Sequence, residues 1–341
     1  MTKVIDLSQP IRTQQLYGGT YSGVTNWNDL KYPQFYQIYK TILQNHWIPD
    51  EVSMANDRKK WDLLSKREQE AYKTFNAMLA MLDSPQAKFL YAVAQQVTDS
   101  AAHDILITIA QQEVVHNQSY SYTLQTLLSQ QEQIKAFSEA KELPSVRKRS
   151  QLIDKYYNEF LENPTLETMA KGLMVSGITE GINFYTAFAF FYNLDRENKM
   201  IDTAKMIQFI QNDECTHKYF ITHTLLPLLL RENPSLNDKG QFELWAKEIV
   251  KTGCELEIEF AKDTLKGIEG ISLRQLESYI KYLGNKLLRM TGFDEVYEGA
   301  DENSMPWIQA YSDETVNELL QDFHERKVTN YNAVDEDFDD L

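Results

Sequence analysis

The feature that most restricts the fold of this chain is a pattern that occurs twice. In each copy, a single carboxylate in an apolar segment is followed, 30 or 34 residues later, by the motif Glu-x-x-His. The first copy consists of Asp83, Glu113 and His116, and the second of Glu180, Glu214 and His217. Residues i and i+3 lie on one face of an α-helix, so each motif can direct a carboxylate and an imidazole at the same point.

The two lone carboxylates need a partner for their charge. A buried carboxylate without a partner costs several kcal/mol, so Asp83 and Glu180 require cations or protons. Four carboxylates and two neutral imidazoles balance two divalent cations, and oxygen and imidazole ligands favour iron or manganese. Helix bundles build dinuclear carboxylate sites from one acid on each of two helices and Glu-x-x-His on each of the other two. We therefore predict a dinuclear metal site, and the alternative is a set of coincidental salt bridges.

The rest of the sequence favours the helices that such a site needs. The chain has only 13 glycines and 9 prolines in 341 residues, and the stretches between them are rich in good helix formers. The length would allow two domains, but long helices can also share one core. We expect an all-α protein with helices at residues 30–46, 67–97, 100–129, 144–161, 166–193, 200–230, 238–266 and 272–291.

Composition excludes several classes of protein. Apolar residues make up 43% of the chain, which excludes general disorder, and the formal charge of −16 makes nucleic acid and anionic membrane surfaces improbable partners. The only two cysteines are Cys215 and Cys254, and Met1 to Pro10 has no secretory signal. We therefore expect a cytoplasmic location.

One apolar segment is long enough to be considered as a membrane span. Residues 172–194 contain a single charged side chain, Glu180, but also several polar ones. No second span of this kind accompanies it. A helix that is apolar all round is also typical of the centre of a large bundle, and we favour that interpretation.

Five segments, in this order, resemble the small, radical-generating subunit of class I ribonucleotide reductase. They are NHWIPDEV around Trp47, EVVHNQSYSY from Glu113 to Tyr122, TEGINFYTAFAF, NDECTHK and ERKVTNY. The resemblance runs from about residue 30 to the C-terminus. It implies an all-α, ferritin-like helical bundle with a dinuclear carboxylate metal site in its core. It also implies that one ion is bound by Asp83, Glu113 and His116 and the other by Glu180, Glu214 and His217.

The resemblance places the family's radical tyrosine at Tyr120, one turn after the first ligating histidine. Helix geometry agrees, because Ile109, Glu113, His116 and Tyr120 share one face, whereas Tyr122 lies about 200° further around. Without the metal face, Tyr120 would be read as an ordinary buried tyrosine. The apolar radical pocket of the family corresponds to Phe184, Phe188 and Ile210.

The resemblance also implies a route for the oxidising equivalent. In the family, the oxidising equivalent passes through a tryptophan that is hydrogen-bonded to an aspartate next to a metal ligand, and then through a tyrosine in the tail. The matching residues are Trp47, Asp213 and Tyr331, and Glu325 matches a glutamate that assists proton movement. Asp213 precedes the ligand Glu214, so it could also accept the spare N–H of a ligating imidazole.

The implied cofactors are two iron or two manganese ions per chain, oxo- or hydroxo-bridged, and a tyrosyl radical. The implied partners are the large (alpha) subunit, a second copy of the chain, and a flavodoxin-like activase if the metal is manganese. The function implied is reduction of ribonucleotides to deoxyribonucleotides. We expect an N-terminal extension at residues 1–29, a ferritin-like helical domain at 30–325, and a flexible acidic tail at 326–341 that docks on the large subunit.

Some details refine this prediction and some leave alternatives. Asp83 and Tyr120 argue against the branch of the family that uses a mixed manganese and iron pair without a radical. Cys215 lies between two ligands in sequence, but position i+1 points about 100° away, so we expect it to face elsewhere. The same ligands would serve a ferritin-like oxidase or monooxygenase, or a non-enzymatic metal-storage protein.

Overall fold

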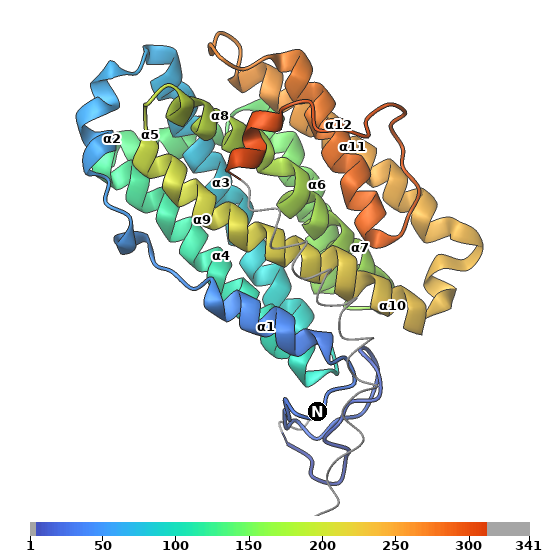
Figure 1. Ribbon diagram of the computed structural model, residues 1–341. Helices are drawn as coiled ribbons and strands as arrows, with labels where there is room; N and C mark the ends of the chain where they lie inside the picture. Colours follow the sequence, from blue (N-terminus) through green and yellow to red (C-terminus); the bar gives the residue numbers. More distant parts are fainter. Residues whose placement is uncertain (1–4, 312–341) are drawn as a thin grey trace, which may run out of the picture.

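The computed structural model describes residues 5–311 and consists of α-helices joined by short connections (Figure 1). Among these residues there is no strand, only an isolated antiparallel bridge between Tyr17 and Val97. The all-α prediction is therefore confirmed. The helices are α1 (Gln34–Gln44), α2 (Ala55–Lys60), α3 (Lys66–Ala94), α4 (Ser100–Leu127), α5 (Gln130–Ala140), α6 (Pro144–Glu162), α7 (Leu166–Ile178), α8 (Tyr185–Arg196), α9 (Ile201–Lys218), α10 (Leu226–Glu232), α11 (Gln241–Thr264) and α12 (Leu273–Thr291).

Two of the predicted helices are interrupted by wider turns. The predicted helix at 166–193 is divided between α7 and α8 by a π-helical segment, Thr179–Asn183, which we call the first π segment. The predicted helix at 200–230 is divided between α9 and α10 by Tyr219–Leu225, the second π segment. A π segment adds a residue to one turn without changing the apolar character of the sequence, so periodicity does not reveal it. Both segments adjoin ligand positions predicted from the sequence.

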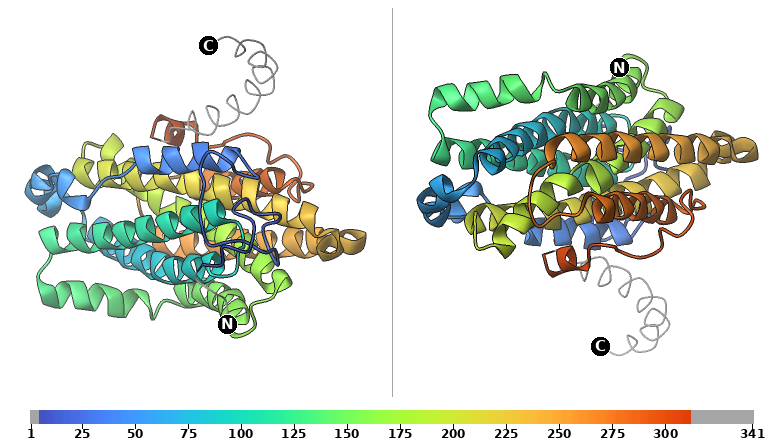
Figure 2. Two further views of the ribbon diagram at one scale, coloured as in Figure 1. Left: turned by 90° about the horizontal axis from the view of Figure 1, so that it is seen from below. Right: turned by 90° about the horizontal axis from the view of Figure 1, so that it is seen from above.

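Two helices were missed because their sequences are polar. α5 begins at a capping box, in which the Ser129 side chain accepts from the backbone of Glu132 and the Glu132 side chain accepts from the backbone of Ser129. Only Ala136 and Ala140 of this helix are buried. α2 is shorter still, at six residues. Figure 2 shows α5 and α1 on opposite sides of the bundle.

The centre of the bundle begins with the hairpin of α3 and α4, which pack along their lengths. α3 starts at a second capping box, between Ser65 and Glu68. α4 starts where the Asp99 side chain accepts from the backbone N–H of Ala102 at 2.9 Å. The connection between these helices is five residues long, so they run antiparallel and can present facing side chains to a common interior.

Residues 172–194 are buried at every position, and this agrees with the prediction of a core segment. None of the helices in residues 5–311 is both long enough and apolar enough to cross a membrane. Two glycines allow a close approach to the second π segment and α9. A Cβ on Gly177 would lie 2.3 Å from the Thr222 methyl carbon, and one on Gly181 would lie 3.0 Å from Cδ of Lys218. Glu180 is thereby brought next to His217.

α11 and α12 form a hairpin on one side of the bundle (Figure 1). Residues 5–33, which precede α1, contain no helix and lie at one end of the bundle. They contact the loop between α3 and α4, where the Thr98 backbone N–H donates to the carbonyl of Leu16 at 2.7 Å. They also contact the end of α10, where the Glu232 side chain accepts from the Leu16 backbone N–H at 2.8 Å.

Candidate metal centre

Six ionisable side chains from four helical segments meet in the interior, and each of them is fully buried. α3 supplies one carboxylate, α4 and α9 each supply a Glu-x-x-His motif, and the first π segment supplies the remaining carboxylate. They are the predicted set, Asp83, Glu113, His116, Glu180, Glu214 and His217. The convergence of these residues in the core agrees with the geometry that the repeated sequence pattern required.

The six side chains form two overlapping groups, within each of which the ligand atoms lie within 4.8 Å of one another. One group contains Asp83, Glu113 and His116, and the other contains Glu113, Glu180, Glu214 and His217. This matches the division expected from the sequence, except that Glu113 belongs to both groups.

Two carboxylates reach both imidazoles. Glu113 lies 3.6 Å from Nδ1 of His116 and 3.1 Å from Nδ1 of His217. Glu214 lies 2.9 Å and 3.4 Å from the same two nitrogens. Glu113 and Glu214 could therefore help to hold either ion, whereas the sequence assigned each of them to one ion.

Both imidazoles turn the same nitrogen toward the cluster and are held through the other one. Nε2 of His116 lies 3.0 Å from the Asp213 carboxylate, and Nε2 of His217 lies 2.9 Å from the Gln112 side-chain oxygen. The arrangement is reciprocal, because the residue before each motif's glutamate binds the histidine of the other motif. A partner at Nε2 fixes the ring orientation and presents Nδ1 to a metal.

Sequence analysis anticipated such a contact for Asp213 but missed Gln112. The signal was available, since Gln112 stands in the same position relative to Glu113 as Asp213 does relative to Glu214. A neutral amide carries no charge that needs compensation, so it is harder to recognise in a sequence than a buried acid, although it can accept the same hydrogen bond.

Apart from their contacts with one another, the atoms that face the middle of the cluster have no hydrogen-bond partner among the described residues. They include both oxygens of Asp83, Glu113 and Glu214, one oxygen of Glu180, and Nδ1 of both histidines. Buried polar atoms are normally hydrogen-bonded, and here the atoms that would bind metal are exceptions, together with Oδ1 of Asp213 and the Tyr120 hydroxyl beside them. The donor set of hard oxygens and imidazole nitrogens fits two iron or manganese ions.

Without cations, the charges of the cluster are balanced by protons. Burial lowers the pKa of His217, but its contacts with Glu113 and Glu214 outweigh burial and raise that pKa to about 9. Burial likewise opposes the protonation of His116, yet Asp213, Glu113 and Glu214 raise its pKa well above the usual value. Burial, and then the charge of Glu113, raises the pKa of Asp83. Cations that bind here therefore compete with protons for the same atoms.

A hydrogen-bonded path leads from the cluster toward Trp47. The indole Nε1–H of Trp47 donates to Oδ2 of Asp213 at 2.8 Å, and the same oxygen contacts His116. The Trp47 ring is nearly parallel to the His116 ring, with 6.1 Å between the ring centroids. Trp47 is 6% exposed, so it lies between the interior and the surface.

Tyr120 follows His116 by four residues on α4 and is buried. Burial, followed by the charges of Asp83, Glu214 and Glu113, raises the pKa of the Tyr120 phenol well above its ordinary value. Its hydroxyl has no hydrogen-bond partner at normal distance among the described residues. Tyr120 is thus a neutral phenol next to the cluster, kept from water.

The residues expected to form the apolar surroundings are all buried, namely Phe184, Phe188 and Ile210. Phe184 and Phe188 lie in contact, with ring centroids 5.9 Å apart. Cys215 is also buried but belongs to neither ligand group, in agreement with the expectation that it faces elsewhere. Tyr331, Glu325 and the tail at 326–341 lie outside the described residues.

One further contact was not predicted. The side chain of Gln86, one turn after Asp83 on α3, donates through Nε2 to the Glu180 carboxylate. Its signal in the sequence was its position i+3 from Asp83, which puts both side chains on the same face of α3.

Comparisons with known proteins agree with this geometry. The sequence model of the family described as "Ribonucleotide reductase, small chain" matches residues 24–304. The ribonucleoside-diphosphate reductase subunit beta of Halalkalibacterium halodurans is 36% identical over 346 aligned residues, which cover 99% of this chain and 98% of that protein. The subunit beta of Treponema pallidum is 32% identical and covers 97% of this chain and 94% of that protein.

A solved structure is also similar along most of its length. The crystal structure of a putative class I ribonucleotide reductase from Bacillus halodurans has a TM-score of 0.85 and 35% sequence identity. The alignment covers 89% of this chain and 97% of that one.

Proposed function

The chain belongs to the family of ribonucleotide reductase small chains, and from that premise we propose that it forms a tyrosyl radical at Tyr120 and passes its oxidising equivalent to a large subunit. The resemblance found in the sequence and the all-α, ferritin-like fold are confirmed by this membership. Small chains of this family act together with a large subunit. Because the relatives are named as parts of ribonucleoside-diphosphate reductases, we propose ribonucleoside diphosphates as substrates of the assembled enzyme.

The observation that carries this proposal is the set of buried, mutually facing ligand atoms without other partners. Asp83, Glu113 and His116 would hold one ion, and Glu180, Glu214 and His217 the other, and Glu113, which belongs to both ligand groups, could serve either ion. When bound, the ion pair supplies the oxidising power that removes an electron from Tyr120. Either two iron or two manganese ions suit these ligands, and manganese would require an oxidant from a flavodoxin-like activase.

The surroundings of Tyr120 suit a stored radical. The raised pKa keeps the phenol protonated before oxidation, so the electron and the phenolic proton must leave together. The buried Phe184, Phe188 and Ile210 would keep water and reductants away from the neutral radical that remains. Among the carboxylates of the cluster, Asp83 contributes most to the raised pKa of the Tyr120 hydroxyl, and we propose that it accepts the phenolic proton.

The route out of the site would begin at the hydrogen-bonded series of His116, Asp213 and Trp47. Asp213 accepts from Trp47, so it can hold the indole proton when the indole is oxidised. We propose that transfer continues to Tyr331, with Glu325 assisting proton movement. For these last two residues, support comes from the resemblance in sequence.

A spectroscopic experiment tests the central proposal. The metal-free protein is loaded with iron in air, or with manganese and an activating flavoprotein, and examined by electron spin resonance. We expect two ions per chain and a tyrosyl signal that is absent in Tyr120→Phe. Binding of two ions without a radical under both conditions would instead favour an oxidase, and binding of many ions per chain would favour metal storage.

We propose that the chain forms a homodimer through α4. An exposed stripe on this helix carries no charge, although the chain as a whole is strongly acidic. The residues are spaced alternately by four and three, as in helices that pack against each other. They are Ile107, Gln111, Val114, Gln118, Ser121 and Gln125. Light scattering should give the mass of a dimer for the wild type and of a monomer for Val114→Lys.

The acidic tail is proposed to dock on the large subunit, with Phe338 and Leu341 as apolar anchors among five carboxylates. Deletion of residues 335–341 should leave the radical signal intact and abolish turnover with the large subunit. Turnover at the wild-type rate would refute the docking role. The cytoplasmic location stays a prediction.

A further inference from the structure

Gln86 is a fully buried side chain whose every polar group has a partner. Its Nε2 donates to Oε1 of Glu180 and, at 2.7 Å, to the hydroxyl of Ser176. Its Oε1 accepts from the Tyr157 hydroxyl. α3, α6 and α7 are thus joined at this amide, next to the first π segment.

The orientation of the Gln86 amide follows from the chemistry of its partners. An ionised carboxylate only accepts hydrogen bonds, so the nitrogen must face Glu180. The amide oxygen then faces Tyr157, whose hydroxyl proton is used in this bond. Loss of the Tyr157 hydroxyl would leave the buried amide oxygen without a partner and remove one of the contacts that keep the amide in this orientation.

This contact makes Glu180 different from the other three carboxylates of the cluster. Both oxygens of Asp83, Glu113 and Glu214 are free of partners outside the cluster, whereas only Oε2 of Glu180 is free. That oxygen lies 3.7 Å from Nδ1 of His217 and faces the ion that His217 would hold. The hydrogen bond from Gln86 occupies one lone pair of Glu180 Oε1 and makes this oxygen a weaker metal ligand than Oε2.

We propose that Gln86 is a positioning residue, locked by Tyr157, that restricts Glu180 to a single metal-binding oxygen. The inference deepens the proposed function, on which it rests, by assigning a control element to one ligand. Glu180 lies in a π segment, a kind of turn that is rare and often marks a functional site. The amide of Gln86, from another helix, gives the Glu180 carboxylate a definite orientation.

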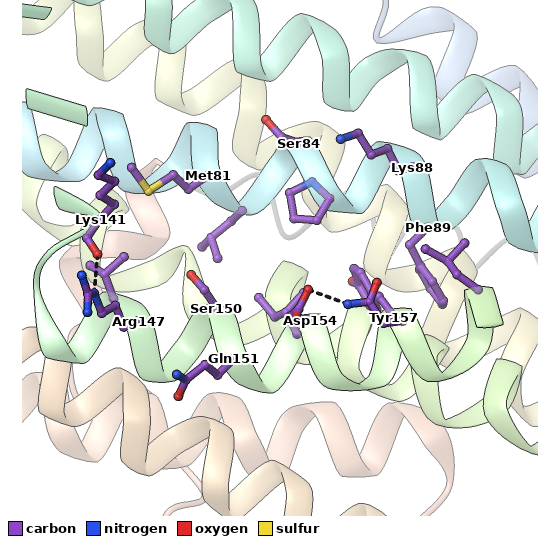
Figure 3. Close-up of a pocket in the computed structure, with 16 residues that line it drawn as sticks. Met81, Ser84, Lys88, Phe89, Lys141, Arg147, Ser150, Gln151, Asp154 and Tyr157 are labelled. Atoms are coloured by element: carbon purple, nitrogen blue, oxygen red, sulfur yellow. Dashed lines mark hydrogen bonds between the residues drawn. The ribbon is translucent and has the colours of Figure 1, made fainter. Parts of the chain in front are cut away.

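The Tyr157 ring is held by packing, so a substitution can remove the hydroxyl and leave the ring in place. The Tyr157 ring is stacked on Phe89 at 4.0 Å with an angle of 7° between the planes. It also lines a surface pocket of about 540 Å³ between α3 and α6, whose upper and lower walls are visible in Figure 3. Phenylalanine can keep the stacking and the shape of this wall while losing only the hydrogen bond.

The experiment measures metal binding directly. Manganese(II) is titrated into the metal-free wild-type chain and into Gln86→Met and Tyr157→Phe, and free manganese is counted by electron spin resonance. Removal of outer partners of metal ligands typically weakens metal affinity about 10- to 100-fold. We expect a loss in this range for one of the two ions in Gln86→Met, a smaller loss in Tyr157→Phe, and little change for the other ion.

Tyr192→Phe is the matched control. Tyr192 is also fully buried and donates to the oxygen of a buried glutamine, Gln211, but Nε2 of that glutamine donates no hydrogen bond to a ligand carboxylate. This variant loses the same kind of hydrogen bond in the same bundle and should bind both ions as the wild type does. Equal losses in Tyr157→Phe and Tyr192→Phe would show a general effect on packing and overturn the proposal.

A crystal structure of manganese-loaded Gln86→Met gives a second readout that does not depend on affinity. We expect both oxygens of Glu180 to bind metal in the variant and one in the wild type. The same single oxygen in both would overturn the inference about Gln86. If the wild type bound no ions at all, the proposed metal centre itself would fail, so the two failures can be told apart.

Discussion

The two halves of the metal cluster share one sequence pattern, a lone carboxylate followed by Glu-x-x-His, but they differ in backbone structure. In the first half, the ligands from α3 and α4 stand on uninterrupted α-helix. In the second half, Glu180 lies inside the first π segment. His217 is the second-to-last residue of α9, just before the second π segment. π segments within helices are rare and often mark functional sites. The comparison suggests a regular half that fixes the cluster and an irregular half that adjusts to it.

The hydrogen-bond partners at Nε2 of the two histidines also differ, because one is charged and the other is neutral. His116, in the first half, contacts a charged group, Asp213, which continues to Trp47. His217, in the second half, contacts the neutral Gln112. Of the two histidines, only His116 is therefore connected through its outer partner to an aromatic side chain, Trp47. The two imidazoles have similar ligand geometry but serve different parts of the proposed mechanism.

The largest effect is expected from Glu113→Ala, because Glu113 belongs to both ligand groups. The variant should lose the paired site and give no tyrosyl signal. Glu180→Ala removes a ligand from the second group alone and should retain one ion. Metal analysis after gel filtration checks both. Retention of two ions by Glu113→Ala would mean that the halves do not share this carboxylate.

The next prediction separates radical formation from radical transfer. Trp47→Phe keeps an aromatic ring but removes the N–H that donates to Asp213, so the radical should form while turnover with the large subunit is lost. Gln112→Leu removes the partner of His217 and should instead weaken metal binding about 10- to 100-fold. Radical yield and turnover are measured for both variants. Loss of turnover at full radical yield in Gln112→Leu would contradict the assigned difference between the halves.

Much of the cluster could be predicted because its chemistry is written in residue types at helical spacing. Asp83 and Glu180 were found as isolated charges in apolar helices, and such charges require compensation wherever the helices pack. The same reasoning could not find that Glu113 and Glu214 each lie close to both imidazoles. That placement depends on how four helices approach one another, and the approach depends on local details such as Gly177 and Gly181.

The helices were predicted where apolar periodicity was strong and missed where it was weak. α3 and α4 were found almost to their ends, whereas the polar α5 was not. The π segments have no signal in periodicity because they are stabilised by tertiary contacts. Gln86 and Gln112 were missed for a related reason, since a buried amide has no charge to mark it and is recognised only by its partners.

The irregular half is also held from outside by a buried ion pair. Arg149 of α6 donates to Glu257 of α11 and, at 3.2 Å, to the carbonyl of Asn183 in the first π segment. Glu257 accepts from the backbone N–H of Thr186 at 3.3 Å. Arg149→Met would leave the Glu257 charge buried without its partner, and should lower the free energy of unfolding by about 3–5 kcal/mol. Guanidinium unfolding of the metal-free protein measures this loss.

A neighbouring ion pair provides the control for that measurement. Lys148 and Glu259 join the same two helices at 2.6 Å, but their side chains are 51% and 40% exposed. An exposed pair contributes at most about 1 kcal/mol, so Lys148→Met should have a small effect. Similar losses in the two variants would show that burial of the Arg149 pair against the π segment has no special importance.

The smallest effect concerns residues 5–33, which contact the loop between α3 and α4 and the end of α10 in different ways. Thr98, between α3 and α4, is bound through its backbone N–H to the Leu16 carbonyl, and this contact does not depend on pH. Glu232, at the end of α10, accepts from Leu16 and from Lys31 at 2.9 Å. Burial raises the pKa of Glu232, but hydrogen bonds from Tyr32, Leu16 and Lys31 outweigh it and lower the pKa below 4.5.

A lowered pKa in the folded state means that ionised Glu232 stabilises the fold above about pH 4.5, and that this contribution is lost as the pH falls through the folded value. Glu232→Gln should therefore reduce the free energy of unfolding by about 1 kcal/mol at pH 7. The difference between variant and wild type should shrink as the pH is lowered below 4.5. Hydrogen exchange should show faster opening at residues 14–17 and at the end of α10, with little change at Ala102 near the start of α4. Equal acceleration of hydrogen exchange at the end of α10 and at Ala102 would show that residues 5–33 stabilise these two regions as one unit.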